Sequence, residues 1–161
     1  MPKLPFRLLV WALPVQVALY GLEASQGLGP ILATFAANVG TIDPAAVDRA
    51  FLIAFALAFA AALLASRTDA HGWPGLVTFL LQAMLPVHAA ALAIGTVLAG
   101  AYLPGTATLL LVATPATLVI FNRAVAEGRF EFSSLLILFV LAATLTFPLA
   151  FICYRLAATG A

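Results

Sequence analysis

Charged residues are scarce in this sequence. Of its 161 residues, 8% are Asp, Glu, Lys or Arg, and 65% are hydrophobic. A soluble domain carries about 25% charged and roughly 45–50% apolar residues, because a surface in contact with water has to be polar. So little charge excludes an ordinary soluble domain. The composition predicts an all-α, polytopic bundle of transmembrane helices, with the lipid bilayer as its first partner.

Lysine and cysteine are almost absent. Lys3 is the only lysine, and the net charge of +1 leaves no basic patch for nucleic acid. Cys153 is the only cysteine, which rules out an internal disulfide and a cysteine-based metal site, so we interpret it as a packing residue. His-Glu-x-x-His, Gly-x-Ser-x-Gly and phosphate-binding loop motifs are also missing. We therefore expect no enzymatic activity, no metal and no cofactor.

Long apolar runs dominate the chain instead. A membrane-spanning helix needs about 20 predominantly apolar residues. We interpret the first run as an uncleaved helix, because Leu22 stands where a signal-peptide cleavage site would need a small residue. The sequence thus predicts one helical membrane domain over residues 1–161, with spans at approximately 5–22, 50–66, 76–100, 106–125 and 133–155.

A further apolar stretch, 28–40, follows the break signal Gly27-Leu-Gly-Pro30. Its apolar part is too short to cross a core of about 30 Å, so we expect a half-helix, a re-entrant segment or an interfacial helix. Counting it as a sixth span would divide the basic residues almost evenly between the two sides. Five spans place Lys3, Arg7, Arg67, Arg123 and Arg129 on one side and Arg49 and Arg155 on the other. This distribution favours a cytoplasmic N-terminus and a multi-pass protein of the cell inner membrane.

Proline and polar residues occur together inside three of the predicted spans. Pro86 lies in the third, Pro115 in the fourth and Pro148 in the fifth. A proline in a membrane helix frees a backbone carbonyl, and polar side chains in lipid should face protein or water. These features predict a substrate- or ion-binding site centred on Pro115. Its candidate residues are Gln82, His88, Thr114, Pro115, Thr117 and Asn122.

Glu23 and His88 each allow more than one interpretation. We interpret Glu23, at the polar end of the first span, as an interfacial carboxylate, and a cation or proton ligand facing a cavity is the alternative. His88 is interpreted as a structural hydrogen-bonding residue, with a protonation site or a haem ligand as alternatives.

The last two predicted spans and the loop between them contain a series of short patterns. They are Ala113-Thr-Pro115-Ala116, Asn122-Arg-Ala-Val-Ala-Glu-Gly128 and Ala142-Ala-Thr-Leu-Thr146-Phe-Pro148-Leu149. In these the chain resembles the C-terminal repeat of the auxin efflux carrier family and, more loosely, the bile-acid–sodium symporter fold. The resemblance implies a repeat with crossing, broken helices, a crossover at Pro115 and ligands from Thr114, Thr117 and Asn122. Such carriers contain two inverted repeats and this chain contains one, so the resemblance implies a second copy or a partner subunit.

The residues support three functional hypotheses. The first is a small transporter or channel subunit with a polar site at a proline-broken helix, acting as a homo-oligomer or with a partner membrane subunit on an unknown ion or small molecule. The second is a non-catalytic structural or assembly subunit of a larger membrane complex, which the small size and the alanine-rich helices favour. The third is a haem- or quinone-binding redox subunit that uses His88.

Overall fold

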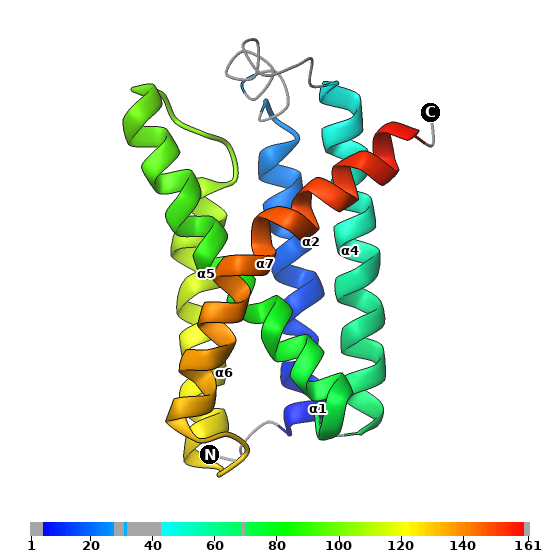
Figure 1. The fold of residues 1–161 in the computed structure, drawn as a ribbon, viewed down its shortest axis with the longest axis vertical. Helices are drawn as coiled ribbons and strands as arrows, with labels where there is room; N and C mark the ends of the chain where they lie inside the picture. The colour runs from blue at the N-terminus through cyan, green and yellow to red at the C-terminus, as the bar shows by residue number, and fades with distance from the viewer. Residues whose placement is uncertain (1–4, 28–30, 32–42, 69, 160–161) are drawn as a thin grey trace.

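The structure, a computed structural model, describes residues 5–27, 31, 43–68 and 70–159. Every regular element in these ranges is a helix (Figure 1). The elements are α1 (Phe6–Leu9), α2 (Ala12–Ala24), α4 (Pro44–Arg67), α5 (Gly72–Ala99), the π-helix η1 (Thr108–Ala113), α6 (Thr114–Ala126) and α7 (Phe132–Thr159). The predicted all-α class is confirmed. Apart from Ile31, the predicted short segment 28–40 lies outside the described residues.

Within the described ranges, five helical stretches are long and apolar enough to cross a membrane, in line with a multi-pass membrane protein. They are Phe6–Ala24, Pro44–Arg67, Gly72–Ala99, Thr108–Ala126 and Phe132–Thr159. The second stretch begins before its apolar run because a helix starts at its cap. Asp43 accepts a hydrogen bond from the N–H of Ala45 at 3.0 Å, and Pro44 occupies the first turn, where a missing N–H costs little.

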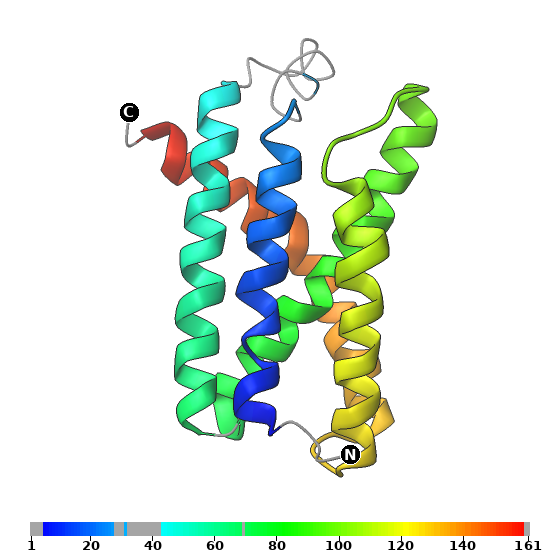
Figure 2. The same ribbon diagram turned by 180° about the vertical axis from the view of Figure 1, so that it is seen from behind.

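α5 and α7 are bent and cross each other in the middle of the molecule (Figures 1 and 2). Each has one proline in its interior, Pro86 in α5 and Pro148 in α7. Proline removes one hydrogen bond of the helix and its ring pushes against the preceding turn, so a long helix bends there. α2 and α4 stand upright beside this crossing, and η1 with α6 stands on the other side of it (Figure 2).

The helix that contains Pro115 is continuous, so the helix break predicted there is wrong. η1 runs directly into α6, and the N–H of Thr114 donates to the carbonyl of Leu109, five residues earlier. The hydroxyl of Thr114 donates to the same carbonyl at 2.8 Å. Next to Pro115 the backbone hydrogen bonds change from joining residues five apart, as in a π-helix, to joining residues four apart, as in an α-helix. Pro115 itself has no N–H and donates no backbone hydrogen bond. The wider π turn therefore accommodates the ring without separating two half-helices.

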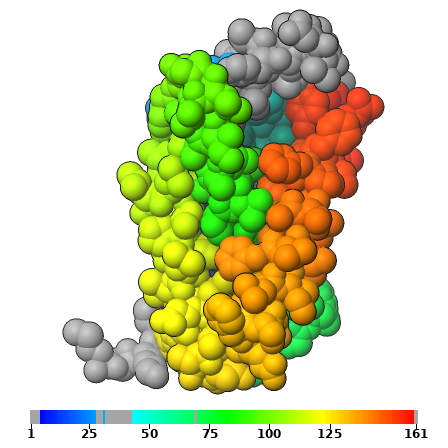
Figure 3. Space-filling view, turned by 60° about the vertical axis from the view of Figure 1, so that its left-hand side comes forward, coloured from blue at the N-terminus to red at the C-terminus, as the bar shows by residue number. Residues whose placement is uncertain are grey.

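Fully buried alanines lie between the helices, and many large apolar side chains cover the outside. Ala62, Ala65 and Ala142 have no exposed surface, whereas Leu111 is 76% exposed and Val119 67% exposed. Alanine allows helix backbones to approach closely, and a lipid solvent accepts large apolar side chains at no cost. At the lower end the rings of Phe121 in α6 and Phe139 in α7 pack edge to face, where these two helices lie side by side in Figure 3. The few buried polar residues therefore stand out.

Candidate functional site

Three polar side chains lie on one face of α2. Gln16, Tyr20 and Glu23 are separated by four and three residues, which is the spacing of one helix face. Each of them contacts a polar side chain from another part of the chain. We call these seven residues the polar seam: Gln16, Tyr20, Glu23, Gln82, His88, Tyr102 and Thr117.

The deepest part of the polar seam joins α2, α5 and α6. The amide nitrogen of Gln82 donates to Oε1 of Gln16 at 2.5 Å and to the hydroxyl of Thr117 at 2.7 Å. Thr117 in turn donates to the carbonyl of Ala113 at 2.8 Å. All three side chains are buried, with at most 3% exposure. Both amide hydrogens and the hydroxyl hydrogen are thus used, which is what burial in a low-dielectric interior requires.

One turn further along α2, Tyr20 meets His88 of α5. The phenol oxygen lies 2.7 Å from Nε2 of His88. The ring of Tyr20 also packs edge-on against Phe51 of α4, with 5.0 Å between ring centroids. Among the described residues Nδ1 of His88 has no hydrogen-bond partner. The imidazole is therefore held at one nitrogen only, and its second nitrogen can accept or donate a further hydrogen bond.

Glu23 ends the polar seam by capping the helix that begins with η1. Its carboxylate accepts from the N–H of Thr108 at 2.7 Å and from that of Ala107 at 3.3 Å, and the phenol of Tyr102 also donates to it. The first N–H groups of a helix have no partner within the helix and carry partial positive charge, so a carboxylate stabilises them. Glu23 therefore does more than end α2 at an interface, because it anchors the start of another span.

A cluster of charged residues lies at the opposite end of α6. Arg123 pairs with Glu127 at 2.8 Å, and Arg129 lies 3.7 Å from the same carboxylate. Both guanidinium groups also lie over the ring of Phe6, at 5.2 and 4.1 Å from its centroid. We call these four residues the arginine clasp. Cation–π and ionic contacts hold the end of α6 against α1 and so close this end of the bundle.

The polar seam and its surroundings leave no buried polar group unsatisfied. Among the described residues, every buried side-chain nitrogen and oxygen atom has a hydrogen-bond partner. The same part of the chain contains no group of three or more His, Cys, Asp or Glu side chains placed to hold a metal ion. In this conformation the polar seam is thus a hydrogen-bonded network between helices, in which Nδ1 of His88 is left without a partner among the described residues.

The structure brings together only part of the residue set predicted from the sequence. Gln82 and Thr117 are directly bonded, and His88 lies on the same helix, bonded to Tyr20. Thr114 bonds within its own helix, and Pro115 and Asn122 are exposed. Asn122 has no side-chain hydrogen bond to any described residue. The polar locus therefore centres on Gln82 and Thr117 and does not include the proline.

Sequence reasoning overlooked Gln16, Tyr20 and Tyr102, and interpreted Glu23 as an interfacial carboxylate at the end of a helix. A signal for three of them was present, because polar side chains at positions 16, 20 and 23 recur at helical spacing in an otherwise apolar span. No comparable signal marks Tyr102, which lies in a loop between two spans and meets Glu23 only through folding.

The contact between Tyr102 and Glu23 predicts an unusual titration. The hydrogen bond to the Glu23 carboxylate raises the pKa of the Tyr102 phenol above its ordinary value. The bond is therefore complete below a pH of about 10, the usual pKa of tyrosine, and is lost as the pH rises through the raised pKa. We expect Glu23→Gln to lower the pKa of Tyr102. Tyrosinate ultraviolet absorbance, with Tyr102→Phe subtracted, measures it. Glu131→Gln is the control carboxylate and should leave the titration unchanged.

Comparison with protein-family models, with curated proteins and with solved structures finds no match to this chain. The likeness to the auxin efflux carrier and bile-acid–sodium symporter families remains a prediction from sequence patterns. The functional argument therefore depends on the polar seam itself.

Proposed function

We propose that this chain is a membrane transport subunit in which the polar seam forms part of the path of a small polar solute or ion. The observation that carries the proposal is the depth of the bonded residues. Gln16 lies ten residues after Phe6, or about 15 Å along a helix at 1.5 Å per residue. This distance is half of a hydrocarbon core of about 30 Å, which puts Gln16, Gln82 and Thr117 near the bilayer centre. Buried polar residues at that depth are expensive and commonly mark a transport path.

The surroundings of this central group support the same proposal. The contacts of Glu23 with Tyr102 and Thr108 close one end, and the arginine clasp closes the other. α5 carries Gln82 one turn before the bend at Pro86. A bent helix that crosses a second bent helix can change its angle without unfolding, which would open one end at a time. The described conformation would then be the closed intermediate.

The proposed orientation places the arginine clasp on the cytoplasmic side of the inner membrane. Four arginines lie at the ends of spans that meet at the N-terminal end of the bundle: Arg7, Arg67, Arg123 and Arg129. Two others, Arg49 and Arg155, lie toward the other end (Figure 1). An excess of arginine in short loops marks the cytoplasmic side. Glu23 and Tyr102 then face the outside.

Cysteine accessibility tests the proposal without knowledge of the substrate. In a Cys153→Ala background, Thr117→Cys is reacted with a membrane-impermeant thiol reagent in right-side-out and in inside-out vesicles. For a transport path that opens alternately to each side of the membrane, we expect slow labelling of the Thr117→Cys thiol in both kinds of vesicle. The matched control is Thr146→Cys, because Thr146 is also buried and bonds only the carbonyl of Ala142, at 2.6 Å, within α7. It should not react from either side.

The second candidate is a non-catalytic assembly subunit, and one observation favours it. Every fully buried side-chain polar atom of the described residues is already paired within the chain, which suits a polar seam that holds helices together. A Thr117→Cys thiol that reacts from neither side would support this candidate and contradict transport. Native mass spectrometry from mild detergent then shows whether the chain associates with itself, as a single-repeat transporter requires, or with other subunits.

A further inference from the structure

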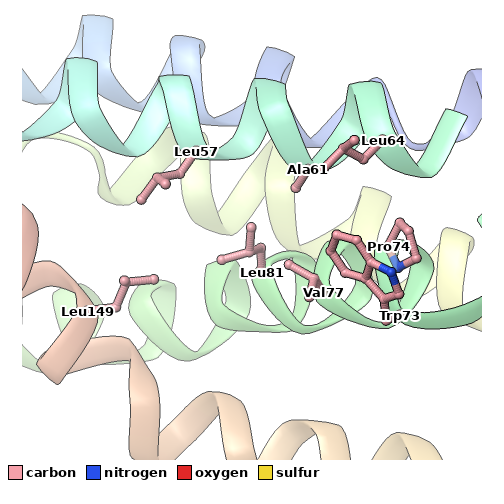
Figure 4. Close-up of a pocket in the computed structure, with 8 residues that line it drawn as sticks. All are labelled: Leu57, Ala61, Leu64, Trp73, Pro74, Val77, Leu81 and Leu149. Atoms are coloured by element: carbon pink, nitrogen blue, oxygen red, sulfur yellow. The ribbon is translucent and has the colours of Figure 1, made fainter. Parts of the chain in front are cut away.

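An apolar groove runs along the outside of the bundle between α4, α5 and α7 (Figure 4). It encloses 260 Å³. Leu57, Ala61 and Leu64 of α4 form one wall, and Val77 and Leu81 of α5 form the other, with Leu149 of α7 at one end. The groove is separate from the polar seam, which lies on the other side of α5 toward α2 and α6.

The groove has a polar mouth. Leu64 and Arg67 are three residues apart on α4, so they lie on the same side of the helix. Arg67 is exposed and has no ion-pair or hydrogen-bond partner among the described residues. Across from it, at the start of α5, Trp73 lines the same end of the groove and is 66% exposed. An exposed tryptophan and an exposed arginine at the same end of two neighbouring spans are typical of the level of lipid headgroups.

The dimensions of the groove match one leaflet. From Leu57 to Arg67 the α4 backbone rises ten residues, or about 15 Å. One leaflet contributes about half of a 30 Å hydrocarbon core, which is also about 15 Å. An acyl chain that starts at the headgroup level would thus reach the inner end of the groove near Leu149.

We propose that this groove is a binding site for an anionic phospholipid, with an acyl chain between α4 and α5 and the phosphate at Arg67. The lining supplies only apolar side chains, which fit a hydrocarbon tail. The charge complementarity lies at the mouth, where the exposed guanidinium of Arg67 has no partner among the described residues. The site is independent of transport, since an assembly subunit would present it equally.

Native mass spectrometry of the full chain in mild detergent tests the site, with dioleoyl phosphatidylglycerol and dioleoyl phosphatidylcholine as probes. We expect phosphatidylglycerol to bind about fivefold more tightly than phosphatidylcholine, which is the gain in affinity that one arginine gives next to an anionic headgroup. Arg67→Gln should remove this preference. Val77→Phe, at a half-exposed lining position, should fill the groove and weaken the binding of both lipids.

Arg155→Gln is the matched control, because Arg155 is an exposed arginine at the other end of the molecule and also lacks a partner among the described residues. It should leave both affinities unchanged. Equal affinities for the two lipids, or an equal loss in Arg155→Gln and Arg67→Gln, would each overturn the proposal. Helix content by circular dichroism establishes that each variant is folded before binding is compared.

Discussion

Replacing Gly105 by alanine is expected to lower the free energy of unfolding by about 3 kcal/mol. Gly105 has a φ of +101°, and a Cβ atom there would lie 2.3 Å from Cε2 of Tyr20. Tyr20 cannot move aside easily, because it is 7% exposed, packs against Phe51 and is bonded to His88. The substitution therefore strains the loop and disrupts the centre of the polar seam together. Titration of SDS into mixed micelles, followed by circular dichroism, measures the loss.

Gly128→Ala separates the two contributions. Gly128 also has a positive φ, +67°, but a Cβ atom there would meet nothing within 4 Å. Gly128→Ala should therefore lower the free energy of unfolding only by the backbone strain, about 1 kcal/mol. If Gly105→Ala is no more destabilising than Gly128→Ala, the close contact with Tyr20 contributes nothing and the described packing of the Gly105 loop is wrong.

The second large effect is expected at Gln82. Gln82→Leu should reduce the free energy of unfolding by about 2 kcal/mol, because the substitution leaves the Gln16 side chain without its partner in a low-dielectric interior. Gln16 is 3% exposed and can gain no compensating water in the closed conformation. The same mixed-micelle titration measures the change. Gln26→Leu, at an exposed position after α2, is the matched control and should change stability by less than about 0.5 kcal/mol.

Replacing both glutamines should affect stability differently from replacing Gln82 alone. In Gln16→Leu/Gln82→Leu no amide is left unpaired, so the double variant should regain at least half of the stability lost in Gln82→Leu. If the polar seam is a transport path, this apolar double variant should nevertheless abolish labelling of the Thr117→Cys thiol. A double variant as unstable as the sum of its single variants would show that the two glutamines do not interact.

The membrane class and the five spans within the described residues could be predicted because they depend on quantities that add along the chain. The free energy of placing a segment in lipid is close to a sum over its residues, so runs such as 50–66 and 133–155 are identified without knowledge of their neighbours. Helix ends were less well placed. α4 starts at Pro44 and α7 continues to Thr159, because a helix continues past its apolar core until a cap or a turn ends it.

The candidate site was predicted only in part because the rotation of each helix about its own axis is not a local property. Gln82 and Thr117 were recognised as costly in lipid, but so was Asn122, which is exposed. Gln16 is 66 positions from its partner Gln82, and no pattern within either span indicates that the two side chains face each other. Pro115 attracted attention because proline usually breaks helices, and the π turn of η1 that accommodates it depends on the surrounding packing.

The amino-acid sequence by itself determined the all-α membrane class and the five apolar spans found among the described residues, because scarce charge and long apolar runs allow no other stable solution. Only the tertiary structure decided which polar groups meet. The bends in α5 and α7 and the close packing of small residues set the helix rotations, and these rotations place Gln82 against Gln16 and Thr117, Tyr20 against His88, and Glu23 at the start of η1. In lipid a buried polar group must find a partner within the protein, so the packing that forms the bundle also forms its candidate site.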